Sequence, residues 1–283
     1  MIMQRTIKYV FARLAEQLKT LYDPAEALSI TRIVAKDGFG ISNIRSERIF
    51  SDADLLRLDK MTKRLLRGEP VQYVLGFTNF YGLRIAVNKK VLIPRQETEE
   101  LVGWILEYRP KIGKQTLLDI GTGSGCIPLA VKHQRPQWRV EGCDHKREIL
   151  AVARKNMREN GLRMVLAQVN ILNKVEWKQY GQFDVIVSNP PYIPYHEAQL
   201  MPDTVKKYEP AGALFVDNED PLIFYKSIAN FAEKHLNPGG SVFFECNEFN
   251  ALDLQVWLGS AGWHTELRKD LNGKDRMLRV WRG

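Results

Sequence analysis

The chain has 283 residues, of which 45% are apolar and 26% charged, and its net charge is +8. This length and apolar content predict a globular protein with room for two domains and a sizeable core. No apolar run approaches the roughly 18 residues of a membrane span, and no signal-peptide pattern opens the chain, so we expect a cytoplasmic protein without membrane contact.

Residues 1–75 are predicted to form a small helical domain, because apolar residues recur at helical spacing without strand-like alternation. Pro24 precedes a helix expected over residues 25–35, a further helix is expected over residues 52–66, and Gly68-Glu69-Pro70 closes the bundle. The residues expected to face inward are Phe11, Leu14, Leu18, Leu21, Ala53, Leu55, Leu56, Leu58 and Leu65.

The excess positive charge lies in the first third of the chain. Residues 1–95 contain 17 Lys and Arg against 9 Asp and Glu, whereas residues 96–283 contain 24 of each. A basic flank suggests an acidic macromolecular partner or contact with nucleic acid. A solvated helical surface gives the same pattern, because its charges also recur at helical spacing, as they do at Lys60, Lys63, Arg64 and Arg67.

A hairpin-like connection is predicted after the helical domain. Aromatic and β-branched residues from Val71 to Ile93 surround turn residues at Gly76, Gly82 and Asn88, and we place the linker at residues 76–95. Pro94 and the acidic residues that follow it are typical of a helix start, and this helix is expected to run to about Glu107. Residues 96–283 are then predicted to form the second domain.

From Thr116 onward, strands and helices alternate, which predicts a mostly parallel sheet with helices on both faces. A buried strand over Thr116–Ile120 leads into a glycine turn and a helix over residues 127–132. Backbone N–H groups of such a turn can approach a ligand closely. Cys126 stands where a dinucleotide fingerprint has its third glycine, so the compressed spacing favours S-adenosylmethionine, which has no pyrophosphate. The turn consists of Gly121, Thr122, Gly123, Ser124 and Gly125.

Two later strand ends supply further candidate cofactor contacts. Asp144 ends a strand that begins at Trp138, and an acidic residue at that point of a Rossmann-like sheet can accept the ribose hydroxyls. The alternative for Asp144 is an N-cap of the helix that starts near Arg147. Asn170 and Ile171 follow a strand expected over residues 164–169 and are predicted to contact the edge of adenine.

The run from Val185 to Ile193 is an apolar strand that ends in Asn189-Pro190-Pro191-Tyr192. The Asn189 side-chain oxygen and the Pro190 carbonyl can each accept an N–H, and the Tyr192 ring can stack on a planar group. Pro190 and Pro191 stiffen the turn, which holds these groups in place. The tetrapeptide therefore predicts methyl transfer to an amide or amino nitrogen, at a crevice between the strands that end at Ile120 and Ser188.

The remaining patterns complete the expected sheet. A tight turn is predicted over residues 236–240, before a strand over residues 241–245, and residues 264–268 and 276–281 predict a final antiparallel pair. The cysteines lack C-x-x-C spacing and the histidines lack a metal-binding arrangement, so we expect reduced core cysteines and no metal. The residues are Cys126, Cys143, Cys246, His133, His145, His196, His235 and His264.

Four stretches resemble the release-factor glutamine N5-methyltransferases of the HemK/PrmC type. They are residues 68–76 (GEPVQYVLG), 91–102 (VLIPRQETEELV), 119–126 (DIGTGSGC) and 189–193 (NPPYI), and the first two are the more specific. The family usually has proline where Gln96 stands, and an Ile-Gly pair where Cys246-Asn247 follows Glu245.

The resemblance implies an α/β fold with a Rossmann-like class I methyltransferase sheet, a small all-α N-terminal domain and a β-hairpin linker. It also implies that S-adenosylmethionine donates a methyl group to the glutamine of a Gly-Gly-Gln loop in peptide chain release factors. The helical domain would help to recognise that partner. Asn189, Pro190 and Tyr192 would then be catalytic, with Pro191 also at the substrate and Asn189 also at the cofactor.

Other readings of the same motifs stay open at this point. An adenine-N6 or guanine-N2 methyltransferase would use the same tetrapeptide on a flipped base, but residues 1–75 lack the basic and aromatic density that we expect of a nucleic-acid-binding domain. A non-catalytic module that binds a release factor or the ribosome would not need the cofactor residues. A dehydrogenase is disfavoured by Cys126. We expect a monomer, because no apolar stripe is obviously left over for a partner subunit.

Overall fold

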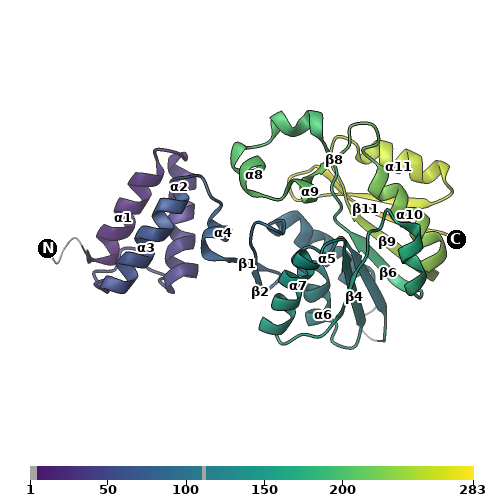
Figure 1. Ribbon diagram of the computed structural model, residues 1–283, viewed down its shortest axis with the longest axis horizontal. Helices are drawn as coiled ribbons and strands as arrows, with labels where there is room; N and C mark the ends of the chain where they lie inside the picture. The colour runs from purple at the N-terminus through teal and green to yellow at the C-terminus, as the bar shows by residue number, and fades with distance from the viewer. Residues whose placement is uncertain (1–4, 110–112) are drawn as a thin grey trace. The chain divides into compact units, whose positions relative to one another are not determined.

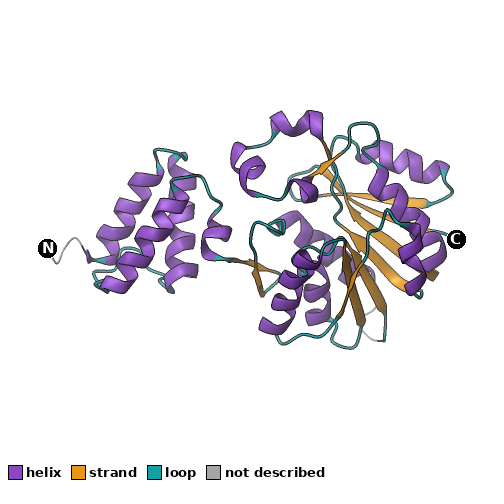
Figure 2. Cartoon of the chain, in the orientation of Figure 1, coloured by secondary structure: helices purple, strands orange, loops and turns teal. Residues whose placement is uncertain are grey.

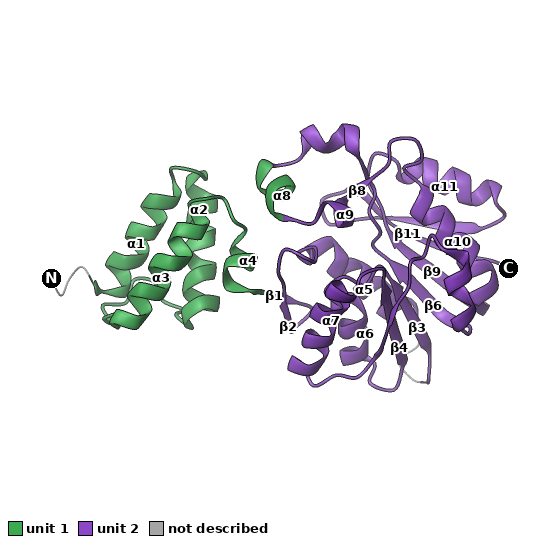
Figure 3. Ribbon diagram, viewed as in Figure 1, with its two compact units in different colours: residues 1–77, 203–208 green, residues 78–202, 209–283 purple. Residues whose placement is uncertain are grey.

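The computed structural model describes residues 5–109 and 113–283, which group into two compact units (Figures 1 and 3). The first unit contains residues 1–77 together with 203–208, and the second contains residues 78–202 and 209–283. Within the described ranges, no helix is long and apolar enough to cross a membrane.

The first unit is helical. Its helices are α1 (Ile7–Leu18), α2 (Pro24–Ile33), the π-helix η2 (Val34–Gly38), α3 (Asp52–Leu65), α4 (Val71–Leu75) and α8 (Asp203–Tyr208). Side-chain oxygens at Thr6, Asp23 and Ser51 accept backbone N–H groups at the starts of α1, α2 and α3, which satisfies donors that have no partner within the helix. The core includes Phe11, Leu14, Leu18, Ala27, Val34, Leu58 and Leu65.

Four sequence expectations for this unit are wrong in detail. Ala53 is exposed in the first turn of α3, away from the buried face of that helix. Leu21 is half exposed because α1 already ends at Leu18, and Leu56 of α3 is 59% exposed because it lies off the buried face of Leu58, Met61 and Leu65. Residues 71–75 form helix α4 and do not open the hairpin. Gly76, in a left-handed conformation (φ 82°), ends that helix, so the hairpin starts only after it.

A hairpin follows α4, with strands β1 (Phe77–Phe80) and β2 (Leu83–Ala86). Tyr81 and Gly82 both have positive φ (49° and 81°), which matches the twist that two-residue hairpin turns require. The helix α5 (Gln96–Tyr108) begins two residues after Pro94, in accordance with the acidic start that the sequence contains.

The second unit is built on a seven-stranded sheet in the order β10-β11-β9-β6-β3-β4-β5 (Figure 2). Strands β3, β4, β5, β6 and β9 are parallel, and β11 and β10 continue the sheet antiparallel. The strands are β3 (Thr116–Ile120), β4 (Arg139–Asp144), β5 (Val165–Gln168), β6 (Phe183–Ser188), β9 (Leu236–Glu245), β10 (His264–Lys269) and β11 (Asp275–Trp281). The α/β class with a Rossmann-like sheet, predicted from the alternating pattern, is confirmed.

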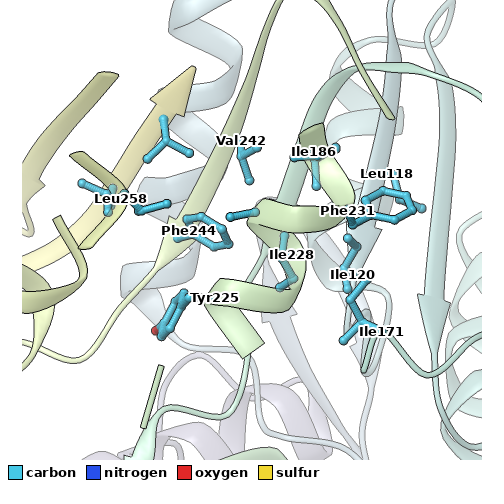
Figure 4. Packing of buried hydrophobic residues seen from close by; sticks show 14 of the residues in the cluster. Leu118, Ile120, Ile171, Ile186, Tyr225, Ile228, Phe231, Val242, Phe244 and Leu258 are labelled. Carbon is cyan, nitrogen blue, oxygen red and sulfur yellow. The ribbon is translucent and has the colours of Figure 1, made fainter. Parts of the chain in front are cut away.

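Helices cover both faces of this sheet, as expected. Tyr225, Ile228 and Phe231 of α10 (Ile223–His235) pack with Leu118 and Phe244 on one face (Figure 4). On the other face, the Trp104 ring of α5 lies edge-on to Phe243, with 5.4 Å between the ring centroids. Neighbouring residues of β9 therefore point to opposite faces, as in any strand of a covered sheet.

The remaining helices of the second unit are α6 (Cys126–Gln134), α7 (Arg147–Glu159), the 3-10 helices η3 (Lys174–Gln179) and η4 (Tyr195–Leu200), α9 (Ala211–Leu214) and α11 (Ala251–Ser260). A separate two-stranded sheet pairs β7 (Ile193–Pro194) with β8 (Phe215–Val216).

Two further expectations need correction. The segment 236–240 belongs to β9 as an irregularity, because Leu236 pairs with Phe183 and Ser241 already pairs with Val185, and Gly239 adopts a positive φ of 74°. The expectation of no leftover apolar stripe does not hold at α11, where Leu252 and Val256 are 60% and 72% exposed and Phe249 lies just before the helix at 69%.

Candidate active site

The glycine turn connects β3 to α6. The N–H groups of Gly121 and Thr122 both donate to the Cys143 carbonyl at 2.9 Å, which fixes the turn to the neighbouring strand β4. Gly121, Gly123 and Gly125 have φ values of 76°, 56° and 79°. These left-handed conformations require glycine, since a Cβ atom would strain the backbone at each position.

Asp144 lies beside this turn at the end of β4. Its Oδ2 accepts the Gly123 N–H at 3.0 Å, and its Oδ1 contacts the N–H and Nδ1 of His145 at 2.8 and 3.0 Å. The N-cap position of α7 is Lys146, and no side chain caps that helix. The N-cap alternative for Asp144 is therefore wrong, and its carboxylate faces the glycine turn.

Strand β6 brings Asn189 to the same place. Because β6 pairs with β3, the ends of the two strands are adjacent, and the Ser188 hydroxyl donates to the Ile120 carbonyl at 2.6 Å. This bond is fully buried and joins the residue before Asn189 to the residue before Gly121. The crevice expected between these strand ends is thus a feature of the sheet order.

A cavity of about 420 Å³ opens at these strand ends. Its lining includes the sequence-predicted residues Gly121, Thr122, Gly123, Ser124, Asp144, Asn170, Ile171, Asn189, Pro190 and Pro191. Two predicted residues do not line it. Gly125 lies behind the turn, where an added Cβ would approach Ala153 and Met164 at 3.2 Å, and Tyr192 packs against the core that contains Tyr225.

Asn170 takes part in the turn that follows β5. Its N–H donates to Glu176 Oε2 at 2.8 Å, and its own Oδ1 accepts the Leu172 N–H at 3.1 Å. Ile171 is buried, and its carbonyl accepts from Trp177 Nε1 at 3.0 Å. These bonds hold both residues at the wall of the cavity.

A buried carboxylate, Glu209, joins two other parts of the cavity wall and was missed from the sequence. Its Oε2 accepts the Ile93 N–H at 3.1 Å, and its Oε1 pairs with Arg95 at 2.5 Å. Pro94 and Pro210, which neighbour these groups, both line the cavity. No local pattern marks Glu209, because its partners lie 114 and 116 residues earlier in the chain.

Two more residues missed from the sequence support Asn189: Thr98, which lines the cavity beside it, and Glu245, which lies outside the lining. The Asn189 Nδ2 is 3.4 Å from the Thr98 hydroxyl, and that hydroxyl donates to Glu245 Oε2 at 2.6 Å. Glu245 also accepts from the Tyr192 hydroxyl, at 3.4 Å. For Thr98, the sequence signal was its place in the acidic start of α5, which suggested a structural role alone. For Glu245, it was a glutamate at the end of a late strand.

Asp119, two residues before the glycine turn, carries buried polar atoms that a bound ligand could pair with. Both carboxylate oxygens and the Thr122 hydroxyl are buried and lack a hydrogen-bond partner in the described part of the chain. Burial, helped by the charge of Asp144, raises the pKa of Asp119 to about 7. The nearby Thr122 hydroxyl offsets part of that rise without reaching hydrogen-bonding geometry.

These residues fit S-adenosylmethionine, which carries a positive sulfonium and an ammonium group. A cation beside Asp119 would compensate its buried charge, Asp144 suits the ribose hydroxyls, and the turn offers close backbone approach. In the described residues, no group of three or more His, Cys, Asp or Glu could hold a metal ion. The three cysteines are free and buried, as predicted.

Comparison with known proteins places this geometry in a class. The family model "Methyltransferase small domain" matches residues 103–220. Among solved structures, a methyltransferase from Pyrococcus furiosus is similar with a TM-score of 0.53 at 21% identity, over 83% of this chain and all of that one. The human methyltransferase 10 domain containing protein has a TM-score of 0.52 at 16% identity, over 82% and 98% of the two chains. The fold and the cavity define a class I, S-adenosylmethionine-dependent methyltransferase.

Curated relatives identify the family. The "PrmC N-terminal domain" model matches residues 10–76. Release factor glutamine methyltransferases from Flavobacterium psychrophilum and Bacteroides thetaiotaomicron are 34% and 35% identical, covering 97% and 95% of this chain and 98% of each relative. The one from Lactococcus lactis is 38% identical over 84% of this chain and 86% of its own. The chain belongs to the release factor glutamine methyltransferase family.

Proposed function

We propose that this protein transfers the methyl group of S-adenosylmethionine to the side-chain amide nitrogen of the glutamine in the Gly-Gly-Gln motif of peptide chain release factors. Family membership supports the reaction and the substrate class. The observation that carries the proposal is the Ser188–Ile120 hydrogen bond at 2.6 Å, because it holds the glycine turn and Asn189 at one cavity.

We assign cofactor binding to the glycine-turn side of the cavity. Bound S-adenosylmethionine would supply an electrophilic methyl group. Asp144 would accept the ribose hydroxyls, and the wall at Asn170 and Ile171 would contact adenine. The backbone of the turn would approach the methionine portion, with Asn189 at the junction with the acceptor. The proposed cofactor set is Gly121, Thr122, Gly123, Ser124, Asp144, Asn170, Ile171 and Asn189 at the cavity, together with Gly125, whose N–H holds the turn by donating to the Thr122 carbonyl.

The acceptor side would hold the substrate amide. Asn189 Oδ1 and the Pro190 carbonyl would accept its two N–H groups, Pro191 would stiffen the turn, and the Tyr192 ring would support the amide plane. Two acceptors draw electron density toward the nitrogen and fix its face toward the methyl group. A C–N bond forms as the S–C bond breaks, and one proton leaves the nitrogen for water.

The first unit is proposed to recognise the release factor, consistent with its match to the PrmC N-terminal domain and with the basic excess in residues 1–95. Release factors act in translation, so we place the reaction in the cytoplasm. We also propose that the protein works as a monomer and that its acceptor is a protein and not nucleic acid, since its curated relatives are release factor glutamine methyltransferases.

An assay with labelled S-adenosylmethionine tests the proposal. It would offer unmodified release factor, a version with Gly-Gly-Ala in place of Gly-Gly-Gln, and total tRNA, rRNA and DNA, with the product located by mass spectrometry. We expect label on the glutamine and none on the variant. Label on nucleic acid alone would move the acceptor to a base amino group, and no label on any of them would contradict catalysis.

A further inference from the structure

The hydrogen bonds behind Asn189 form a connected chain from three elements. Thr98 comes from α5, Glu245 from the end of β9, and Asn189 and Tyr192 from the turn after β6. Thr98 is 3% exposed and Glu245 2% exposed. Thr98 lines the cavity beside Asn189, whereas Glu245 lies behind it.

The direction of each bond follows from proton count. An ionised carboxylate can only accept, so the single hydroxyl proton of Thr98 lies on the 2.6 Å contact with Glu245. The Thr98 oxygen can then only accept from Asn189, and the Asn189 group that faces it must be the NH₂. The Asn189 side-chain oxygen consequently lies on the side away from Thr98.

We infer that Glu245, acting through Thr98, sets the amide orientation of Asn189 so that its oxygen is presented to the acceptor nitrogen. This inference rests on the proposed function. With the amide turned over, the NH₂ of Asn189 would meet the N–H groups of the substrate, and donors would face donors. Thr98 and Glu245 are thus positioning residues, since neither is required to touch the reacting atoms.

Protonation of Glu245 would undo this arrangement. A neutral carboxyl can donate to the Thr98 oxygen, which frees the Thr98 hydroxyl to donate to the oxygen of Asn189 and so favours the turned amide. Burial raises the pKa of Glu245, and Glu97 raises it further, while the Thr98 hydrogen bond, Arg276 and the Tyr192 hydroxyl lower it.

Two further titratable groups lie next to the Glu245 backbone. The Tyr225 hydroxyl donates to the Glu245 backbone carbonyl at 3.0 Å, and the buried Cys246 thiol is next in the chain. We therefore expect kcat to fall as the pH drops through the raised pKa of Glu245, even when S-adenosylmethionine is saturating.

The test uses full-length protein with a purified release factor at saturating S-adenosylmethionine. Thr98→Val keeps the size of the side chain but removes the hydroxyl, and we expect kcat to fall at least about tenfold. Thr98→Ser restores the hydroxyl and should return kcat to within about threefold of the parent. The dissociation constant for S-adenosylmethionine, measured by calorimetry, should change less than about twofold in both variants.

Thr116→Val is the matched control. The Thr116 hydroxyl also donates to a carboxylate, Asp184 Oδ2 at 2.9 Å, and accepts the Asp184 N–H at 3.0 Å, but at the start of β3 and outside the cavity lining. This control should keep the parent kcat. Thermal unfolding of all variants separates loss of fold from loss of orientation. A Thr98→Val protein that is folded and keeps the parental kcat would overturn the inference.

Glu245→Gln provides the second measurement, since glutamine has no carboxyl proton to gain. The acid fall in kcat seen in the parent should be absent in this variant. Persistence of the same fall would overturn the role of Glu245. A parent protein that fails to methylate glutamine would instead contradict the proposed function, and this inference with it.

Discussion

The two sides of the cavity differ in how their polar groups are satisfied. Near the glycine turn, the Thr122 hydroxyl of the cavity lining and the carboxylate of Asp119, which is not part of that lining, are buried without a hydrogen-bond partner in the described ranges. On the acceptor side, the Thr98 hydroxyl accepts from the Asn189 amide and donates to Glu245. One region therefore offers polar atoms that a bound ligand could pair with, whereas the polar groups around Asn189 pair within the protein.

This difference predicts different consequences for binding and for rate. Unpaired buried groups raise the free energy of the ligand-free protein and are compensated when a ligand pairs with them, so they contribute mainly to affinity. Groups that are already positioned lower the reorganisation needed in the transition state, so they contribute mainly to kcat. Substitutions on the two sides should separate the two quantities.

The largest effect is expected for Asn189→Ala. This change removes an acceptor that orients the amide in the transition state, so kcat should fall on the order of a hundredfold or more. Steady-state methylation of a release factor would measure it, with calorimetry for cofactor affinity. Asn160→Ala is the control, because the Asn160 amide donates only to the Arg84 and Asn156 carbonyls in the bonds described for it. A near-parental kcat in folded Asn189→Ala protein would contradict the assigned role.

An intermediate effect is expected for Asp119→Asn, on the affinity for S-adenosylmethionine and not on kcat. Loss of the buried charge should weaken S-adenosylmethionine binding about tenfold at pH 8, where the parent carboxylate is ionised. Calorimetry with the unreactive product S-adenosylhomocysteine serves as a comparison, because that ligand lacks the sulfonium charge. Equal affinity of parent and variant for S-adenosylmethionine would show that Asp119 does not face the cation.

The same variant should be more stable without ligand, and the gain should depend on pH. The pKa of Asp119 is raised to about 7 by burial, so the folded state binds more protons than the unfolded state between pH of about 4 and about 7. The free energy of unfolding of the parent therefore falls as the pH rises through that window. Asparagine at this position does not ionise, so the variant does not lose this stability. The Tm advantage of the variant should be larger at pH 8 than at pH 5. An advantage that does not change with pH would contradict the raised pKa.

The smallest effect is expected for Tyr192→Phe. The Tyr192 hydroxyl is 3.4 Å from Glu245, at the long limit of a hydrogen bond, and the ring remains in the variant. We expect kcat within about threefold of the parent, whereas Tyr192→Ala should cost about tenfold or more through loss of the packed ring. A large loss in Tyr192→Phe would show that the hydroxyl, and not the ring, carries the role.

Local features of the fold could be predicted because local chemistry decides them. The start of α2 follows from Asp23 and Pro24, which supply a side-chain cap and a fixed φ at adjacent positions. The glycine turn follows from three glycines whose left-handed conformations other residues rarely adopt. The antiparallel pair β10–β11 follows from alternating strands around Asn272-Gly273. Each signal lies within a few residues of the structure that it specifies.

The sequence by itself thus determined the class of fold, the glycine turn beside Asp144, and the Asn189–Tyr192 turn. Only the tertiary structure decided which distant residues support them. Thr98 and Glu245 are 147 positions apart in the chain, and they meet because α5 packs against strand β9 of the sheet. The pairing of β6 with β3 likewise brings Ser188 to Ile120. Such contacts depend on how the whole core packs, and the periodicity of a single segment contains no record of the partner that it will meet.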